Sequence, residues 1–310
     1  MLVHLNHQLV PAEQAKVSVF DRGFLFGDGV YEGLRVTRGG GGSVRVIGLG
    51  HHVERMRAGL AEARIQGFDP ARLEEMTLEL AAANGLDEAA VYWQISRGAP
   101  PAGAPLRARV PDPRSTPTVF GYAAAIKPVS AYTQPEVRRV SLRPDTRWTR
   151  GQLKSISLLG GVLAAIEADE LGGDDAIMHK GGLITEGTAT NVFIARGNRL
   201  ITPSLDSAPM LAGVTRALIL EEDPTIEVRP LAIEEFHAAD EVMLTGTYTM
   251  VSAISTIDGT PVGGAHTRAP GPMACRLLEL LHRAIARDTG TARTTPASSQ
   301  PAQAAQPCST

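Results

Sequence analysis

Lysine is rare in this sequence, and one lysine lies where an amine could do chemistry. Only Lys16, Lys127, Lys154 and Lys180 occur among 30 lysine and arginine residues. Lys154 directly precedes the apolar stretch SISLLGGVLAAIEA, which predicts a helix from about Leu158 to Leu171. An amine in apolar surroundings loses its proton more readily and becomes nucleophilic. Taken alone, a solvated lysine at a helix start is still the simpler interpretation.

Two further segments are candidate parts of a site, one with an acidic residue and one with a helix start. Glu186, in GGLITEGTATNVFIA, lies between a predicted hairpin strand and a glycine and threonine turn. Gly213, Val214 and Thr215 begin a predicted helix in LAGVTRALILEE, and the NH groups and dipole of a helix start attract phosphate. Each has an ordinary alternative: a loop carboxylate for Glu186 and a helix N-cap for Thr215.

A partial dinucleotide-binding pattern occurs in SVRVIGLGHHV, but it is incomplete. Gly48 and Gly50 have the first two glycine positions, whereas Val53 stands where the helix would have to approach the strand closely. The run Gly39 to Gly42 before it indicates a hairpin tip and not a βαβ unit. A dehydrogenase is therefore a poor interpretation.

Composition excludes several other classes of protein. The 310 residues are 43% apolar with a formal net charge of −3, and no basic block suggests binding to nucleic acid or to an anionic membrane surface. No apolar run approaches the ~20 residues of a membrane span, so we expect a cytoplasmic protein. Cys275 and Cys308 provide neither a disulfide framework nor a metal site.

The order of the predicted elements indicates mixed α and β structure in two domains. A small N-terminal domain is expected over 1–126, a linker over 127–135 and a larger domain over 136–288, with a disordered tail over 289–310. Within the first domain, Ala99 to Pro117 is a long loop rich in Pro, Gly, Ala and Arg. Loops of that length usually serve a binding site or move.

Taken together, the motifs of this chain resemble those of the fold type IV pyridoxal-phosphate (PLP) enzymes, the family of D-amino-acid and branched-chain aminotransferases. The resemblance runs from about Leu2 to Ala284. Seven segments follow in the family's order: DRGFLFGDGVYEGLRV, HHVERM, VYWQISRG, LKSISLLG, ITEGTATNVF, ITPSLDSAPMLAGVTR and DEVMLTGTYT. Any one is weak, but seven in order with compatible spacing are specific.

The resemblance implies a two-domain α+β fold, with a small N-terminal α/β domain and a larger PLP-binding domain that has a barrel-like mixed sheet and helices. It implies that Lys154 is the catalytic, Schiff-base lysine and that Glu186 pairs with the pyridine nitrogen of PLP. The implied phosphate ligands are Arg55, in an H-x-x-R pattern, together with Val214, Thr215 and Thr247. A carboxylate beside the ring keeps its nitrogen protonated, as an electron sink requires.

The substrate residues are less well defined by these motifs. Tyr31 has the aromatic position that lines the substrate side of the cofactor, and Tyr92 and Gln94 lie on the polar face of a predicted strand. Related D-amino-acid enzymes typically hold the substrate carboxylate with an Arg-x-His pair, which this chain lacks. Arg107 and Arg109, in the long loop, are the proposed replacement; solvated loop arginines are the alternative. Arg35 in YEGLRV instead resembles the branched-chain enzymes.

The expected function is transfer of an amino group between a D-amino acid, of the D-alanine or D-glutamate type, and a 2-oxo acid. A branched-chain L-amino-acid aminotransferase, an (R)-amine transaminase and aminodeoxychorismate lyase are the alternatives. A PLP or amino-acid binding protein without turnover is disfavoured by the presence of both Lys154 and Glu186. The family resemblance also implies a homodimer.

Overall fold

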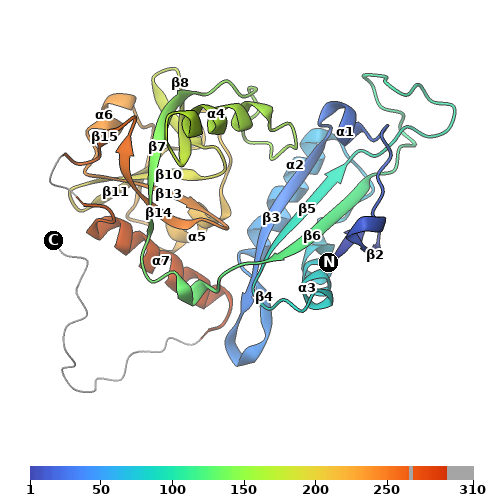
Figure 1. Cartoon of the computed structure of the whole chain (residues 1–310), viewed down its shortest axis with the longest axis horizontal. Helices are drawn as coiled ribbons and strands as arrows, with labels where there is room; N and C mark the ends of the chain where they lie inside the picture. The colour runs from blue at the N-terminus through green and yellow to red at the C-terminus, as the bar shows by residue number, and fades with distance from the viewer. Residues whose placement is uncertain (265–267, 292–310) are drawn as a thin grey trace. The chain divides into compact units, whose positions relative to one another are not determined.

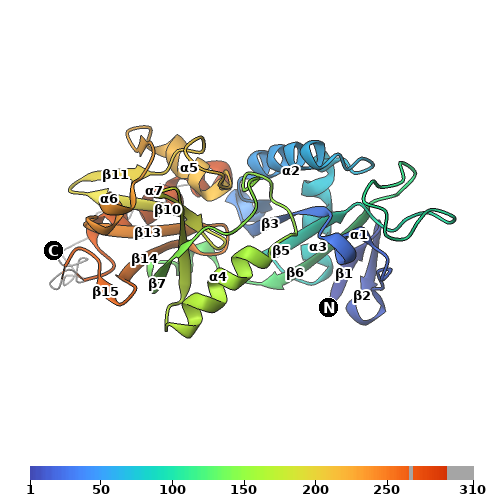
Figure 2. The ribbon, with the colours of Figure 1, turned by 90° about the horizontal axis from the view of Figure 1, so that it is seen from above.

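A computed structural model describes residues 1–264 and 268–291, and its internal contacts divide the chain into two compact units. Unit 1 consists of Met1–Arg38, Gly42–Pro128 and Gly151–Leu159, and unit 2 consists of the remaining residues. The segment that carries Lys154 was expected in the larger domain, 136–288. By its contacts it belongs to unit 1, because it pairs with a strand of that unit. Figures 1 and 2 show the elements of each unit.

Unit 1 is built on a six-stranded antiparallel sheet. Its strands, in the order in which they pair, are β2 (Gln8–Pro11), β1 (Leu2–Leu5), β6 (Thr118–Ala125), β5 (Ala89–Ser96), β3 (Gly29–Arg38) and β4 (Val44–Val46). Helices α2 (Leu49–Ala63) and α3 (Leu73–Ala83) cover one face of the sheet, and the short helix α1 (Arg22–Phe26) precedes β3 (Figures 1 and 2).

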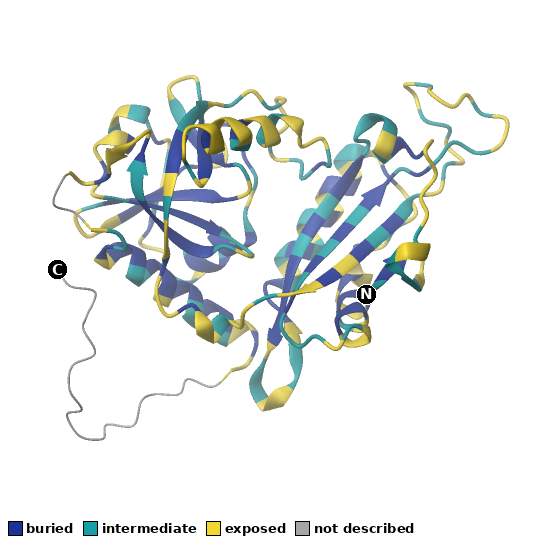
Figure 3. Ribbon diagram, in the orientation of Figure 1, coloured by how far each residue is buried: buried dark blue, intermediate teal, exposed yellow. Residues whose placement is uncertain are grey.

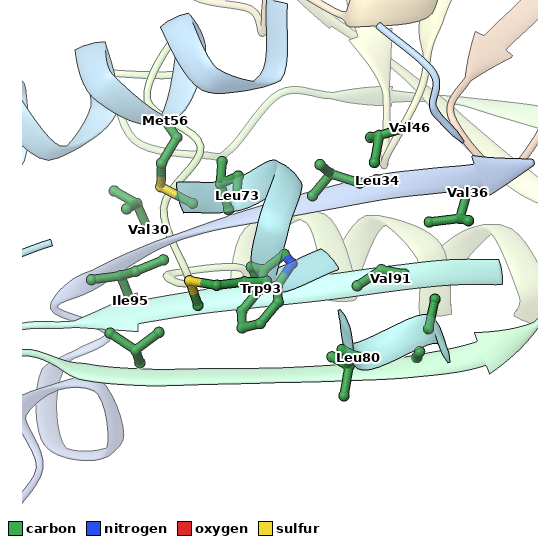
Figure 4. Close-up of a cluster of buried hydrophobic side chains, with 14 of the residues drawn as sticks. Val30, Leu34, Val36, Val46, Met56, Leu73, Leu80, Val91, Trp93 and Ile95 are labelled. Carbon is green, nitrogen blue, oxygen red and sulfur yellow. The ribbon is translucent and has the colours of Figure 1, made fainter. Parts of the chain in front are cut away.

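Alternation along the strands of unit 1 separates a core face from a polar face. Figure 4 shows Val30 and Leu34 of β3 beside Val91 and Trp93 of β5, packed under the helices. Buried and less buried residues therefore alternate along β3, β5 and β6 (Figure 3). Gly121 is required opposite Trp93, since a Cβ there would lie 2.5 Å from the indole ring.

Unit 2 is built on a nine-stranded mixed sheet. Its strands, in pairing order, are β12 (Glu227–Val228), β11 (Arg199–Thr202), β10 (Asn191–Arg196), β13 (Glu241–Gly246), β14 (Met250–Ile257), β7 (Glu136–Pro144), β8 (Asp175–Lys180) and β9 (Leu183–Gly187), with β15 (Thr260–Pro261) on β14. The hairpins predicted across Gly181-Gly182 and Arg196-Gly197-Asn198 are confirmed as β8–β9 and β10–β11.

The helices of unit 2 are α4 (Leu159–Glu170), whose first residue belongs to unit 1, α5 (Val214–Glu222), α6 (Ile233–His237) and α7 (Pro272–Asp288). Helix α7 is amphipathic and buries its leucine stripe. Helix α4 is different, because it packs Ala164 and Ala168 against Ala176 and Met178 of β8 while its larger side chains stay exposed (Figure 3).

The predicted disordered tail, 289–310, lies outside the described residues from Ala292 to Thr310. Its first part was predicted wrongly: Thr289 is buried and its hydroxyl donates to the Ile285 carbonyl at the end of α7. No helix among the described residues is long and apolar enough to cross a membrane.

Candidate active site

Lys154 lies beside β3 in unit 1, in a segment that extends the sheet. Ser155 forms an isolated bridge with Val30, the Lys154 carbonyl accepts from the Tyr31 NH at 3.0 Å, and the Ile156 NH donates to the Gly29 carbonyl. The Lys154 Nζ atom lies 4.1 Å from the centre of the Tyr31 ring. In the described part of the chain Lys154 forms no ion pair with a carboxylate. The amine is therefore held on an aromatic face without a bound counter-ion.

Tyr31 belongs to a row of aromatic side chains on the face of the sheet opposite α2 and α3. The Tyr31 and Tyr92 ring centres are 5.6 Å apart, and Tyr92 and Tyr122 stack at 5.4 Å. The Tyr92 hydroxyl donates to the Gln94 side-chain oxygen at 3.0 Å. Burial raises the pKa of Tyr92, and so do Tyr31 and Tyr122, so its hydroxyl stays protonated. Tyr31, Tyr92 and Gln94 thus share one polar and aromatic face.

Arg55 is held by a buried carboxylate on the opposite face of β3. Glu32, which is fully buried, accepts from the Arg55 Nε and Nη2 atoms at 2.7 Å each and contacts the His52 Nδ1 atom at 2.7 Å. Burial alone would raise the pKa of Glu32, but Arg55, and then His52, lower it to about 2. The guanidinium of Arg55 is therefore fixed in place, as a preorganised anion site requires.

Arg35, predicted to contact substrate, is buried, and its Nη2 atom donates to the Lys127 carbonyl at 2.5 Å. This hydrogen bond joins β3 to Lys127, which lies shortly after the end of β6. The role of Arg35 in substrate binding stays a prediction.

The two loop arginines, Arg107 and Arg109, lie together on the ring of Phe26 in α1. Both guanidinium carbons are 5.3 Å from the centre of that ring. Neither guanidinium forms an ion pair with the residues that the structure describes. Arg22, also in α1, holds the loop by donating to the carbonyls of Ala108 and Arg109 at 2.6 and 3.1 Å.

The loop is also fixed at its base. Asp28 accepts from both Arg22 and Arg97, and although burial alone would raise the pKa of Asp28, these two arginines lower it. Gly98, with φ +81°, begins the loop, and a Cβ there would lie 1.8 Å from the Thr116 carbonyl oxygen. The two ends of the loop therefore meet in a close contact between Gly98 and Thr116, and only glycine fits at the first of these positions.

Glu186 lies in β9 of unit 2, and both of its carboxylate oxygens have partners. The Arg147 Nη1 atom donates to Oε1 at 2.6 Å, while the Leu211 NH and the Asn191 Nδ2 atom donate to Oε2 at 3.1 and 3.4 Å. The carboxylate is buried. Its position is thus determined by three separate segments of the chain.

The start of α5 is linked to the same asparagine. The Asn191 Nδ2 atom also donates to the Leu211 carbonyl at 3.0 Å, and a Cβ at Gly213 would lie 1.8 Å from the Asn191 Oδ1 atom. Gly213 caps α5 without a side-chain hydrogen bond, so the first-turn NH groups at Val214 and Thr215 are available for an anion. The alternative interpretation, an N-cap by Thr215, is not formed, because Gly213 is the N-cap and Thr215 lies inside the helix.

Buried hydroxyl groups next to this helix start suit a polar ligand. Asn191 pairs with Thr245 across β10 and β13, and Thr247 follows β13 in a half-buried turn. Within the described residues, the hydroxyls of Thr190 and Thr245 are buried and have no hydrogen-bond partner. Buried polar atoms without partners are rare, so unit 2 offers the carboxylate, helix start and hydroxyls that the ring nitrogen and phosphate of PLP need. Its residues fit that cofactor.

The structure assigns the predicted site residues to the two units. Unit 1 holds the lysine, the phosphate-binding arginine and the substrate residues: Lys154, Arg55, Tyr31, Arg35, Tyr92, Gln94, Arg107 and Arg109. Unit 2 holds Glu186, Val214, Thr215 and Thr247. Sequence reasoning missed the residues that support them: Glu32 beneath Arg55, Arg22 beneath the loop, and Arg147 and Asn191 around Glu186.

Comparisons with known proteins agree with this chemistry. Residues 29–257 match the family described as amino-transferase class IV. The D-alanine aminotransferase of Bacillus licheniformis is 31% identical over 294 residues, covering 93% of this chain and 99% of that protein. The D-alanine aminotransferase of Staphylococcus haemolyticus is 29% identical, covering 91% of this chain and 97% of that protein.

Solved structures show the same architecture. A branched-chain aminotransferase from Thermoproteus uzoniensis, with norvaline, has a TM-score of 0.77 and 26% identity, covering 93% of this chain and 95% of that one. A branched-chain amino acid aminotransferase of T.th., with pyridoxamine 5′-phosphate, has a TM-score of 0.76 and 27% identity, covering 93% and 94%. The expected α+β fold is confirmed. This chain belongs to the class IV amino-transferase family, and it is a PLP-dependent aminotransferase of fold type IV.

Proposed function

We propose that this enzyme transfers the amino group of a D-amino acid, of the D-alanine or D-glutamate type, to a 2-oxo acid by a ping-pong mechanism. The observation that carries the proposal is the pair of loop arginines on Phe26, which lack a carboxylate partner among the described residues and would suit a substrate carboxylate. The two D-alanine aminotransferases that match nearly the whole chain support it.

In this proposal each residue has a defined task. Bound PLP supplies an electron sink for negative charge at the substrate α-carbon. The Nζ atom of Lys154 would hold the cofactor, and its amine would move the proton at the substrate α-carbon. Glu186 keeps the ring nitrogen protonated, and Arg55, the α5 start at Val214 and Thr215, and Thr247 bind the phosphate. Tyr31 lines the substrate side.

Spectra with three amino donors test the proposal. The PLP-loaded protein should show an absorption band at roughly 400–420 nm, typical of PLP joined to a lysine. We expect D-alanine to remove this band, with release of pyruvate, while L-leucine and (R)-1-phenylethylamine leave it unchanged. A response to (R)-1-phenylethylamine alone would assign an amine transaminase. Release of pyruvate together with 4-aminobenzoate from aminodeoxychorismate would assign the lyase, and a band that no donor removes would indicate a binding protein.

A branched-chain L-amino-acid aminotransferase is the second candidate. It is favoured by the similarity to solved branched-chain enzymes. Arg35 offers it no support, because this side chain is buried and donates to the Lys127 carbonyl. Loss of the band with L-leucine but not with D-alanine would establish this candidate in place of the first.

We propose that Arg107 binds the carboxylate of the substrate and that Arg109 takes the place of the histidine in the Arg-x-His pair of related enzymes. Arg107→Ala is expected to raise KM for D-alanine by about 10- to 100-fold, as for loss of a charge-assisted hydrogen bond, and to leave PLP binding unchanged. Arg114→Ala is the matched control, since Arg114 lies in the same loop but pairs with Asp112. An unchanged KM in Arg107→Ala would contradict this role.

A homodimer is also part of the proposal, and α4 is the surface that supports it. This helix turns small alanines toward the sheet and leaves Leu159, Val162, Leu163 and Ile166 exposed at helical spacing, with Leu159 69% exposed. Large aliphatic side chains are normally the ones buried. The row carries no charge, so a two-fold axis would not bring like charges together. A cytoplasmic location stays part of the proposal.

Val162→Ser combined with Ile166→Ser is expected to weaken the dimer at least about 100-fold, because each protomer would lose roughly 2–3 kcal/mol of apolar burial. Light scattering over a dilution series would show the change. Asp169→Ser, an exposed site on the same helix, is the control. A wild-type protein that stays monomeric at all concentrations would refute the homodimer.

A further inference from the structure

Arg147 is a partly buried cation that none of the assigned tasks uses. It lies in the loop after β7, outside any helix or strand, and its side chain is 18% exposed. Its Nη1 atom donates to Glu186 at 2.6 Å, while its Nε and Nη2 atoms donate to the two carboxylate oxygens of Asp145 at 2.9 and 2.7 Å. One guanidinium therefore joins two carboxylates that are each about 95% buried.

Asp145 is fixed in turn from two directions. It accepts from the Arg147 NH at 3.1 Å and from the Thr185 hydroxyl at 3.2 Å, and Thr185 directly precedes Glu186 in β9. Burial alone would lower the pKa of Arg147, but Asp145 and Glu186 raise it, and Arg147 in turn lowers the pKa of Asp145 against its burial. Arg147 and Asp145 are therefore both charged in the folded protein.

We propose that Arg147 is a positioning residue that keeps the Glu186 carboxylate ionised and correctly oriented for the cofactor's ring nitrogen. This inference rests on the proposed role of Glu186. The guanidinium donates to Oε1, and the Leu211 NH and the Asn191 amide both donate to Oε2. Donors on both oxygens hold the carboxylate in one orientation, and it is this orientation that the N–H of a pyridine ring would meet.

Arg147 is a cation in direct contact with the Glu186 carboxylate, at 2.6 Å. Other charged side chains on elements around Glu186 include Asp145, Asp175 on β8, which accepts from Thr188, and Arg216 on α5, whose guanidinium donates to Thr202 and to the Pro203 carbonyl. Without Arg147, two buried carboxylates would stand near each other, and one of them would take up a proton. A protonated Glu186 could no longer hold the ring nitrogen in its protonated form.

The first test needs no cofactor. In the apoprotein with 13C-labelled glutamate side chains, Glu186 is identified by the signal that disappears in Glu186→Gln. We expect its carboxylate to take up a proton at a higher pH in Arg147→Gln than in the wild type and in Arg147→Lys. Asp145→Asn is the matched control, because it removes the Arg147–Asp145 ion pair but keeps the Arg147–Glu186 pair. In this variant Glu186 should titrate as in the wild type. An unchanged Glu186 titration in Arg147→Gln would overturn the inference.

The second test measures PLP affinity by equilibrium dialysis between pH 6 and pH 9. For Arg147→Gln we expect affinity close to that of the wild type at pH 9 and an additional loss of about tenfold per pH unit below the new Glu186 titration. The double variant Arg147→Gln, Glu186→Gln should match Glu186→Gln alone. Equal weakening at every pH, with a lower melting temperature of the apoprotein, would mean a merely structural role and overturn the inference. If the wild type takes up no PLP, the proposed function fails, whereas the carboxylate titration still decides what Arg147 does to Glu186.

Discussion

Lys154→Ala is expected to lower the turnover number for D-alanine by at least about a thousandfold, because one side chain both attaches the cofactor and moves the α-proton. The change should affect folding little. Lys154 is half-buried, and the segment is held to β3 by its backbone, through the Tyr31 NH and the bridge between Val30 and Ser155. These contacts do not depend on the lysine side chain.

Mass spectrometry after borohydride reduction separates the two tasks of this lysine. The wild type should carry covalently bound PLP on the peptide that contains Lys154, and Lys154→Ala should carry none while its far-ultraviolet spectrum stays unchanged. Lys16→Arg is the control, since Lys16 is an exposed lysine of the same unit. PLP that remains covalently bound in Lys154→Ala would show that another lysine is the attachment site.

The sequence was most informative where function limits the choice of residue type. Lys154 could be singled out because a chain that uses arginine almost everywhere had kept a lysine before an apolar helix. Its β-bridge to Val30 could not be predicted, since it joins segments far apart in the chain. That long-range pairing is why the lysine segment lies in unit 1 and outside the domain in which it was expected.

Supporting residues are harder to identify from sequence because their types are ordinary. Arg147 is one of many arginines, and PDTRWTRGQLK has no periodicity or motif that distinguishes it. Glu32 did leave a signal: it interrupts the apolar alternation of Val30, Leu34 and Val36, and a carboxylate on a core face needs a cation. The pattern does not say which cation, because Arg55 lies on a helix more than twenty residues away.

The same limit applies to Arg35. Its position in YEGLRV matched a family pattern, and strand alternation assigns it to the face that carries Tyr31. Whether a side chain on that face is exposed to solvent or buried depends on which other segment of the chain packs against it. Here the segment at Lys127 receives the guanidinium, and Arg35 is almost fully buried.

Glu32→Gln is expected to lower the free energy of unfolding by about 3–5 kcal/mol, because it leaves the Arg55 guanidinium without the buried charge that compensates it. Glutamine keeps the shape of the side chain, so the loss measures charge and not packing. Urea unfolding at pH 7 gives the difference. Glu54→Gln on α2 is the matched control, since Glu54 pairs with Arg57 at an exposed site, where such pairs contribute about 0–1 kcal/mol.

The pH dependence of unfolding provides a second, independent measure of the same carboxylate. The pKa of Glu32 is lowered from 4.5 to about 2, so its stabilisation, about 3 kcal/mol by linkage, is complete above pH 4.5 and is lost as the pH falls toward 2. His52, whose pKa burial lowers from 6.5, adds a loss that begins below pH 6.5. The wild type should therefore lose stability more steeply than Glu32→Gln between pH 4.5 and the lowest pH at which it folds. Parallel curves over that range would mean that Glu32 is not ionised beside Arg55, and the preorganised phosphate site would lose its physical basis.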